Sequence, residues 1–300
     1  MTESRLRSFV ALADTGSVRS AARRLYVTES AVSAAVTALS RELGLPLVER
    51  EGRGVRLTPA GTAYATYARQ VLGLLEQGRA AARGAADPAR GPLRLAAVTT
   101  AADQILPSLL AGFRRRWPEV DLTLEVGPSR QVWTSLADHS ADLVLAGRPP
   151  PGAPATVLAR RPNGLVIVGS PEQAEGFALD TTPWVMREPG SGTRVTAETY
   201  LAGRNVAPPR LVLGSNGAVV AGAAEGLGVA LVSRDAVGAH LADGRLEIID
   251  APGTPMSRPW HAVGGAVPTP TTRLFVAHLL AAPGWLTESD SADRSPKGSP

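Results

Sequence analysis

Three stretches of the chain combine hydroxyl side chains with glycine in a way that suits the binding of a small anion. They are Val98 to Thr100, Pro189 to Thr193 and Gly214 to Asn216. Each follows an apolar run typical of a strand and precedes a predicted helix, whose first backbone N–H groups lack partners and carry partial positive charge. The alternative is that these residues only cap helices and close turns, which is their commonest use.

We expect an anion to lie where strands end and helices begin, because ligands of open α/β sheets gather outside the carboxyl ends of the strands. The expected contacts are Thr99, Thr100, Ser129, Gly147, Ser191, Gly192, Thr193 and Asn216. Arg194 either faces the ligand or forms an ion pair with Glu188 or Glu198.

The sequence offers little for catalysis. There is no cysteine, the only lysine is Lys297, and the stretches GSGTR and GSNGA differ from the G-x-S-x-G nucleophile elbow. Asp138 and Asp142 read as solvated helix ends. The scattered histidines are His139, His240, His261 and His278. We therefore expect no enzyme, no metal site and no cofactor, with an enzyme on the same architecture kept as an alternative.

A second group of polar side chains lies on a predicted helix from Thr28 to Leu43. Apolar residues recur at helical spacing first from Val18 to Leu25 and again from Val32 onward. Thr28 can cap the second helix, and Glu29 suits the positive end of its dipole. This pattern is typical of a helix-turn-helix, although an alanine-rich amphipathic helix in an ordinary core would share it.

The outward face of this second helix is small and polar, so its backbone could approach the base edges of DNA. The expected contacts are Thr28, Glu29, Ser30, Ser33 and Thr37. Two short strands, 47–49 and 55–57, are then predicted around a glycine-containing tip that forms a wing. Arg50, Arg53 and Arg56 are expected to meet phosphates or a minor groove. The alternative for this segment is a solvated basic hairpin.

Composition agrees with a DNA partner at the N-terminal end. Residues 1–83 hold 12 arginines against 7 acidic residues, a net charge of +5, whereas residues 84–300 are at −1. A phosphate backbone would meet the positive end. The 300 residues suggest two domains, and no signal peptide or membrane span is recognisable, so we expect a cytoplasmic protein with no membrane partner.

A long helix is predicted to begin at Thr58-Pro59, a capping residue followed by a first-turn proline. A heptad-like stripe runs along it through Tyr64, Ala68, Val71 and Leu75. Because a stripe of this kind calls for a covering helix, we expect a homodimer that addresses a dyad site on DNA. The alternative is that the stripe packs on its own chain.

Beyond a short flexible segment, strands and helices alternate, which indicates a mostly parallel α/β region of two lobes around a cleft. We expect one helix over 104–117 and other helices from Arg194, Asn216 and Arg234. The expected divisions are a winged helix-turn-helix domain over 1–58, a linker helix over 59–83, a hinge over 84–92, a bilobed domain over 93–284 and a disordered tail over 285–300. Lobe I would comprise about 93–158 and 265–284, and lobe II about 159–264.

Taken together, these segments resemble the LysR-type transcriptional regulators. The resemblance rests on FVALADTGSVRSAARRLYVTESAVSAAVTALSRELGLPLVER, GRGVRLTPAG, FRRRWPEVDLTL, REPGSGTR and AEGLGVALVSR, and it extends to about Leu280. It implies a homotetramer built from two dimers, promoter DNA and RNA polymerase as partners, and an effector bound between lobes similar to periplasmic solute-binding folds. REPGSGTR is similar to the version in regulators of carbon-fixation and sulfur genes.

The sequence also departs from this family pattern. The reading helix begins with Glu29 where glutamine is typical, and Ala34 stands where a basic or amide residue is usual. A carboxylate can accept a hydrogen bond from cytosine N4 but repels phosphate, so the usual half-site preference does not carry over. A nucleoid-type architectural protein without effector control is the other alternative.

Overall fold

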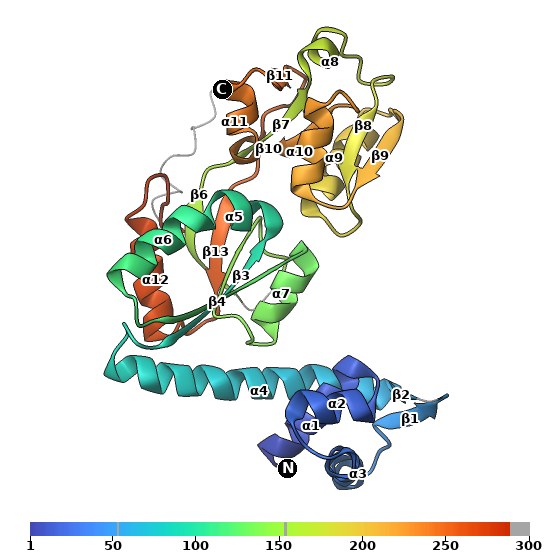
Figure 1. Cartoon of the computed structure of the whole chain (residues 1–300), viewed down its shortest axis with the longest axis vertical. Helices are drawn as coiled ribbons and strands as arrows, with labels where there is room; N and C mark the ends of the chain where they lie inside the picture. Colours follow the sequence, from blue (N-terminus) through green and yellow to red (C-terminus); the bar gives the residue numbers. More distant parts are fainter. Residues whose placement is uncertain (53, 153–154, 289–300) are drawn as a thin grey trace. The chain divides into compact units, whose positions relative to one another are not determined.

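The computed structural model describes residues 1–52, 54–152 and 155–288 (Figure 1). The chain forms two compact units, one of residues 1–82 with the short segment 137–140, and one of the remainder. Within the described residues, no helix combines the length and apolar character needed to span a bilayer.

The N-terminal domain is a three-helix unit followed by a hairpin. Its elements are α1 (Glu3–Thr15), α2 (Val18–Leu25), α3 (Glu29–Leu43), β1 (Val48–Glu51) and β2 (Gly54–Leu57). The Thr28 hydroxyl accepts the backbone N–H of Ala31 at 3.2 Å, and α3 ends at Gly44 in the left-handed conformation. The predicted helix-turn-helix and its cap are therefore present. Each observed strand of the wing is one residue longer than the predicted strand.

The next helix, α4 (Pro59–Ala86), contributes its first turns to the core of this domain. Ala68 is buried among the side chains of α1 and α3, and the ring of Tyr64 lies 5.5 Å from that of Phe9. Tyr64 and Ala68 therefore pack within their own domain, which favours the alternative that this part of the stripe is covered by its own chain. Val71 and Leu75 remain exposed.

Exposed ion pairs also join α1 to α4. Glu3 accepts hydrogen bonds from Arg79, with Nη2–Oε2 at 2.6 Å, and from Arg7, with Nε–Oε1 at 2.9 Å. These guanidinium groups lower the pKa of the Glu3 carboxyl to about 2. Glu3 is therefore ionised wherever the protein is folded near neutral pH.

Helix α4 runs three residues beyond the predicted end of the linker, to Ala86. Gly84 is buried against Thr271, which also approaches Gly91 closely. The predicted hinge over 84–92 is therefore shorter than expected, because α4 continues past Gly84 and a strand begins at Pro92.

Lobe I is a five-stranded sheet with helices on both faces (Figure 1). In the order β4-β3-β5-β13-β6 the strands are Asp121–Gly127, Pro92–Val98, Leu143–Ala146, Trp260–Gly264 and Thr156–Arg161. Its helices are α5 (Thr99–Gln104), α6 (Leu106–Arg116), α7 (Ser129–Ala137) and α12 (Pro270–Leu280). β3 pairs in parallel with β4 and β5, but β13 is antiparallel to both neighbours, so the sheet is mixed rather than mostly parallel.

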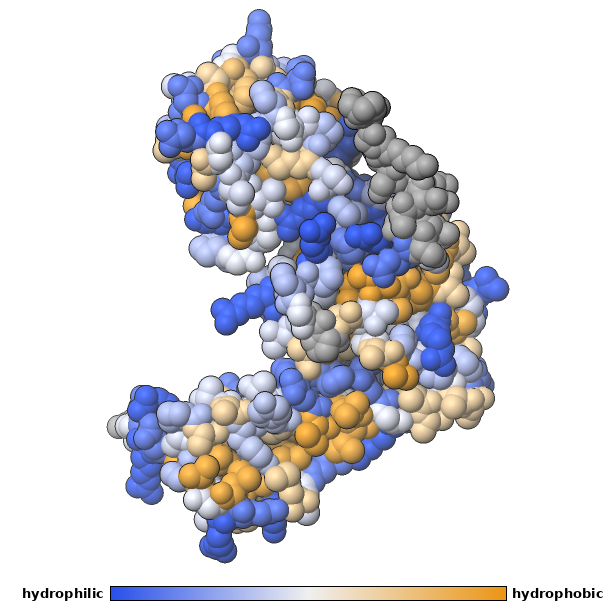
Figure 2. Space-filling view, turned by 180° about the vertical axis from the view of Figure 1, so that it is seen from behind, coloured by the Kyte–Doolittle hydropathy of each residue, from blue (hydrophilic) through white to orange (hydrophobic). Residues whose placement is uncertain are grey.

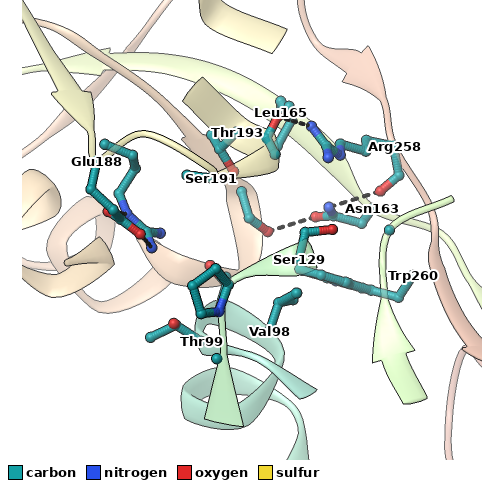
Figure 3. A pocket seen from close by; sticks show the side chains of 17 residues that line it. Val98, Thr99, Ser129, Asn163, Leu165, Glu188, Ser191, Thr193, Arg258 and Trp260 are labelled. Atoms are coloured by element: carbon teal, nitrogen blue, oxygen red, sulfur yellow. Dashed lines mark hydrogen bonds and ion pairs between the residues drawn. The ribbon is translucent and has the colours of Figure 1, made fainter. Parts of the chain in front are cut away.

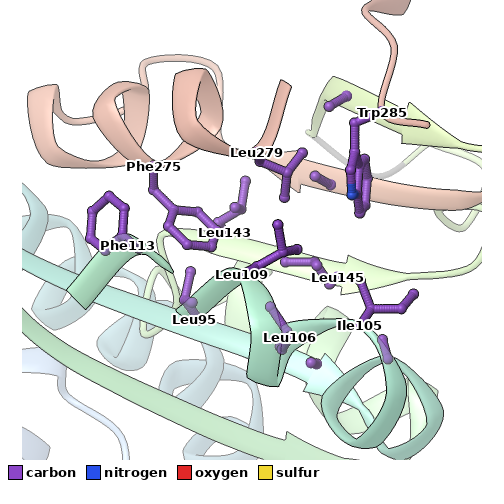
Figure 4. Close-up of a cluster of buried hydrophobic side chains, with 14 of the residues drawn as sticks. Leu95, Ile105, Leu106, Leu109, Phe113, Leu143, Leu145, Phe275, Leu279 and Trp285 are labelled. Atoms are coloured by element: carbon purple, nitrogen blue, oxygen red, sulfur yellow. The ribbon is translucent and has the colours of Figure 1, made fainter. Parts of the chain in front are cut away.

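The helix predicted over 104–117 is α6, and a short helix that was not predicted, α5, precedes it and ends beside Ile105. Pro107 lies in the first turn of α6, where its missing N–H is tolerated, and it favours a new start there. Phe113 of α6 packs against Phe275 of α12 with ring centroids 5.0 Å apart (Figure 4). Together these helices cover one face of the lobe I sheet.

The segment after α12 is ordered as far as the described chain extends. Trp285 is buried in the lobe I core (Figure 4). The backbone of Leu286 exchanges hydrogen bonds with that of Arg160. The prediction of disorder from 285 is therefore wrong for residues 285–288, because this indole adds apolar surface to the core. Residues 289–300 lie outside the described residues.

Lobe II has two small sheets. The strands are β7 (Gly164–Gly169), β8 (Trp184–Arg187), β9 (Arg210–Leu213), β10 (Ala230–Ser233), β11 (Glu247–Ile249) and β12 (Met256–Ser257). β10, β11 and β12 pair antiparallel with β7, whereas β8 and β9 pair in parallel. The helices are α8 (Pro171–Glu175), α9 (Gly192–Ala202), α10 (Asn216–Ala224), the 3₁₀ turn Arg234–Ala236 and α11 (Gly238–Ala242). Sequence analysis did not anticipate α8, β11 or β12.

Two strands shift the division between the lobes. β6 continues to Arg161 and β13 begins at Trp260, and both belong to the lobe I sheet. The chain therefore crosses between lobes at 162–163 and 258–259, inside the predicted span of lobe II.

Asp142 was predicted to be solvated, but it is buried and accepts hydrogen bonds from the backbone and guanidinium of Arg94.

Candidate functional site

One cavity lies between the two lobes, at the ends of strands from both (Figure 3). Its volume is about 50 Å³, enough to hold a few water molecules or a small ligand. Seven of the eight predicted effector contacts line it: Thr99, Thr100, Ser129, Gly147, Ser191, Gly192 and Thr193. The hydroxyl and glycine stretches, distant in sequence, therefore meet at one place.

The elements explain this convergence. Thr99 follows β3 directly and begins α5, Ser129 begins α7, and Ser191 caps α9 by accepting the backbone N–H of Arg194. Ser191 thus caps a helix and also lines the cavity. The two alternatives from the sequence, helix capping and ligand contact, are therefore compatible with each other at Ser191.

Arg187, at the end of β8, is a lining residue that sequence analysis missed. Its side chain is buried, and its Nε and Nη2 atoms each donate to the carboxylate of Glu188 at 2.7 Å. Asn216, predicted as a direct ligand contact, is buried outside the cavity lining, and its Oδ1 faces the Nη1 of Arg187 at 3.4 Å. Asn216 therefore stands behind Arg187, and a direct contact between Asn216 and a ligand stays a prediction.

Arg258 is the second arginine that lines the cavity, and it touches both lobes. Its Nη1 donates to the carbonyl of Gly192 at 2.7 Å and also contacts Thr196, while its side chain passes close to Gly147 of lobe I. Burial lowers the pKa of this guanidinium from its ordinary value.

The two crossings between the lobes are hydrogen-bonded to each other beside this cavity. The backbone N–H of Arg258 donates to the carbonyl of Asn163 at 2.8 Å, and the Asn163 side chain donates to the carbonyl of Arg258 at 3.0 Å. Ser233 donates to Asn163 at 2.7 Å. This reciprocal pair fixes where the two crossings run past each other.

Arg194 resolves one alternative of the sequence analysis. Its Nε donates to Glu198 at 2.8 Å and its Nη1 to the backbone carbonyl of Arg187 at 3.0 Å. It does not line the cavity. A signal for Arg187 and Glu188 was available in REPGSGTR, where the first two residues precede the glycine turn.

The expected DNA contacts share one exposed surface. Thr28, Glu29, Ser30, Ser33 and Thr37 are all exposed, whereas Val32, Val36 and Leu39 on the opposite side of α3 are buried in the core. Helix α3 is therefore amphipathic with its small polar face outward, as a groove-binding helix requires.

The wing carries acidic as well as basic residues. Arg50 is exposed on β1, whereas Arg56 on β2 forms a 2.6 Å ion pair with Glu49 across the hairpin and a 3.4 Å pair with Glu51. Exposed pairs of this kind are weak. Arg53 lies outside the described residues.

Two family models match the chain, and between them they span almost all of it. The model described as "Bacterial regulatory helix-turn-helix protein, lysR family" matches residues 4–62, and "LysR substrate binding domain" matches residues 86–283. The chain belongs to the LysR family of transcriptional regulators. It therefore combines a helix-turn-helix DNA-binding domain with an effector-binding domain, and the resemblance noted from its motifs is confirmed.

Several relatives share this arrangement along their whole length. The chain is 34% identical over 290 residues to a RuBisCO operon transcriptional regulator of Acidithiobacillus ferrooxidans, covering 92% of this chain and 93% of the relative. It is 33% identical over 285 residues to the HTH-type transcriptional regulator CbbR of Rhodospirillum rubrum, covering 92% and 95%. These similar proteins are transcriptional regulators.

Solved structures agree in fold. A full-length OxyR variant from Pseudomonas aeruginosa matches with a TM-score of 0.69 at 21% identity, covering 94% of this chain and 96% of that one. The Synechocystis PCC6803 CcmR regulatory domain in complex with 2-PG matches with a TM-score of 0.59 at 27% identity, covering 63% and 96%. The fold of the effector region is therefore that of LysR regulatory domains.

Proposed function

We propose that this LysR-family regulator acts in the cytoplasm as a homodimer that assembles to a homotetramer, binds a dyad promoter site and is switched by a small acid in the cleft between its lobes. The observation that carries the effector class is the cavity itself, where hydroxyls from both lobes surround Arg187 and Arg258. Guanidinium and hydroxyl groups are donors suited to carboxylate and phosphate oxygens. The complex of the CcmR regulatory domain with 2-PG supports the same class.

Within this class we propose a two- or three-carbon acid that carries a phosphate and a carboxylate. Such a ligand can reach Thr99 on lobe I and Ser191 on lobe II together, since both line one cavity. Calorimetric titration of the full chain with 2-phosphoglycolate, orthophosphate and acetate tests this. We expect 2-phosphoglycolate to bind most tightly, and silence toward all three anions would refute the proposed class.

The cleft is proposed to bind its ligand without transforming it. The ionisable side chains in its lining are Arg187, Arg258 and Glu188, the carboxylate is held by Arg187, and no histidine lies among the lining residues that the structure describes to activate a hydroxyl. Recovery of the titrated acid unchanged after prolonged incubation is the expected result.

For DNA we propose that the polar face of α3 meets bases and that the wing meets phosphates. Arg50→Ala should weaken binding to all sequences and lower the salt slope by about one, as loss of a phosphate contact does. Arg210→Ala, an exposed arginine of lobe II, is the control. A loss confined to one DNA sequence, with an unchanged salt slope, would contradict the assignment of Arg50.

Footprinting on promoter DNA separates this proposal from a nucleoid-type architectural protein. A protected dyad whose pattern changes on addition of the acid is expected, and coating in proportion to DNA length would favour the architectural alternative. RNA polymerase is proposed as the partner that reads the change, and transcription in vitro from the protected promoter tests it.

For the dimer we propose the exposed side of α4. Tyr67, Val71, Leu74 and Leu75 are all exposed there, at spacings of four, three and one residues, and Figure 2 shows hydrophobic side chains along this helix. A partner helix with the same stripe would cover them in the manner of a coiled coil.

A further inference from the structure

Arg187, one of the two arginines that line the cleft, already forms an ion pair with a carboxylate of the same chain. The Arg187 side chain is only 8% exposed, and its Nε and Nη2 atoms both donate to Glu188, whose side chain is 27% exposed. Both residues line the cavity. A buried guanidinium therefore faces the ligand space with a carboxylate of its own chain bound to it.

The geometry of this pair is the one an acidic ligand would use. Carboxylates and phosphates bind guanidinium groups through two parallel hydrogen bonds along one edge, and Glu188 fills the Nε–Nη2 edge with two bonds of 2.7 Å. The remaining Nη1 atom faces Asn216 at 3.4 Å. An acid entering the cleft cannot form a bidentate contact along this edge while the Glu188 carboxylate stays there.

Glu188 is able to leave. It is the more exposed member of the pair, and as the residue after β8 it precedes the turn Pro189 to Gly190 instead of lying within the sheet. A carboxylate that rotates toward water regains hydration, so its release costs less than release of a buried group would. Arg187, at the end of the strand, stays in place.

We propose that Glu188 is a built-in competitor for the effector, and that the acidic group of the effector replaces its carboxylate on Arg187. This inference rests on the proposed effector class and deepens it. The charged side chains that line the cleft are Arg187, Arg258 and Glu188, a net of one positive charge. The exchange leaves both arginines for the ligand.

This arrangement selects for strongly charged ligands. A monoanion that replaces Glu188 forms only the hydrogen bonds to Arg187 that the Glu188 carboxylate loses. A ligand with both a phosphate and a carboxylate also reaches Arg258 or the hydroxyls of the opposite lobe. Because Arg187 lowers the pKa of the Glu188 carboxyl, the competitor is ionised at neutral pH. Small monocarboxylates such as acetate, at low concentration, therefore do not displace Glu188 from Arg187.

Substitution of the competitor tests the proposal. Glu188→Gln removes the negative charge but keeps nearly the same side-chain shape. Glu188→Ser is a second variant, which also removes the two hydrogen bonds to the Nε–Nη2 edge of Arg187. Glu198→Gln is the matched control, since Glu198 also pairs with an arginine of lobe II, Arg194 at 2.8 Å, but does not line the cavity. The full-length proteins are titrated calorimetrically with 2-phosphoglycolate and with orthophosphate, after their melting curves have established that each is folded.

We expect both Glu188 variants to bind these anions about ten- to a hundredfold more tightly than wild type, the range for a hydrogen bond to a charged group, with Glu198→Gln unchanged. If wild type binds the anions and the Glu188 variants bind equally or more weakly, Glu188 only supports Arg187, and the competitor proposal falls while the effector class stands. If none of the four proteins binds either anion, removal of the carboxylate has exposed no anion site, and both proposals fall.

Discussion

Leu74→Ala on the exposed face of α4 tests the dimer most directly. Leu74 is 57% exposed in the single chain. Complete burial of a leucine is worth about 1.5–3 kcal/mol, so burying the exposed part contributes roughly 0.9–1.7 kcal/mol per subunit. Two-fold symmetry doubles this to about 1.8–3.4 kcal/mol, because each subunit brings its own Leu74. The dimer dissociation constant should therefore rise roughly 20- to 300-fold.

Sedimentation velocity across a concentration series measures this constant. Leu45→Ala is the control, because Leu45 is 55% exposed in the N-terminal domain but lies before α4. We expect the control to dissociate at the wild-type concentration and Leu74→Ala to become monomeric well above it. Equal dissociation constants for the two variants would show that this face of α4 is not the interface.

Three further predictions concern the N-terminal domain. Gly61→Ala should destabilise this domain by several kcal/mol in thermal unfolding, because a Cβ at this position would overlap the carbonyl of Leu47. Gly78→Ala on the same helix places its Cβ in open space and should stabilise the domain by about 0.5–1 kcal/mol. Equal melting temperatures for the two variants would contradict this prediction. Tyr26→Asn should raise stability by about 1 kcal/mol, since Tyr26 has a φ of 56° and is 96% exposed, so that the left-handed backbone is relieved and no packing is lost; a lower melting temperature would refute it. The melting temperature of wild type should exceed that of Glu3→Gln at pH 7, and the difference should shrink as the pH falls from about 4.5 toward 2. The reason is that the pKa of Glu3 in the folded protein is lowered to about 2, so the stabilisation by its carboxylate is lost on protonation. A difference in melting temperature that persists at pH 2 would exclude this cause.

The N-terminal domain was predictable because its signals are local. Thr28 as a cap, Gly44 as a terminator and the spacing of Val32, Val36 and Leu39 act within one helix, and the structure bears each of them out. The dimer stripe was only half predictable. Periodicity identifies an apolar face but does not say what covers it, and Phe9, far away in sequence, covers its first part.

The cleft shows the same division between local and distant information. Its hydroxyl residues could be found because capping chemistry marks where helices begin, as at Ser191. Arg187 was marked only by its place before the glycine turn of REPGSGTR, and Arg258 was not marked at all, since an arginine in sequence carries no sign of burial. Arg258 reaches the cavity only because the chain crosses between lobes there, and the mixed sheet that sets this crossing depends on the antiparallel pairing of β13.

An effector can act only through contacts that differ between two arrangements of the lobes. An acid held by Thr99 alone, or by Ser191 alone, would bind any arrangement equally and shift nothing. Arg258 changes this, because it lies at a crossing, contacts Gly192 of lobe II and passes beside Gly147 of lobe I. A ligand bound by Arg258 would meet a side chain that already contacts both lobes, so we expect its affinity to depend on how the lobes are arranged.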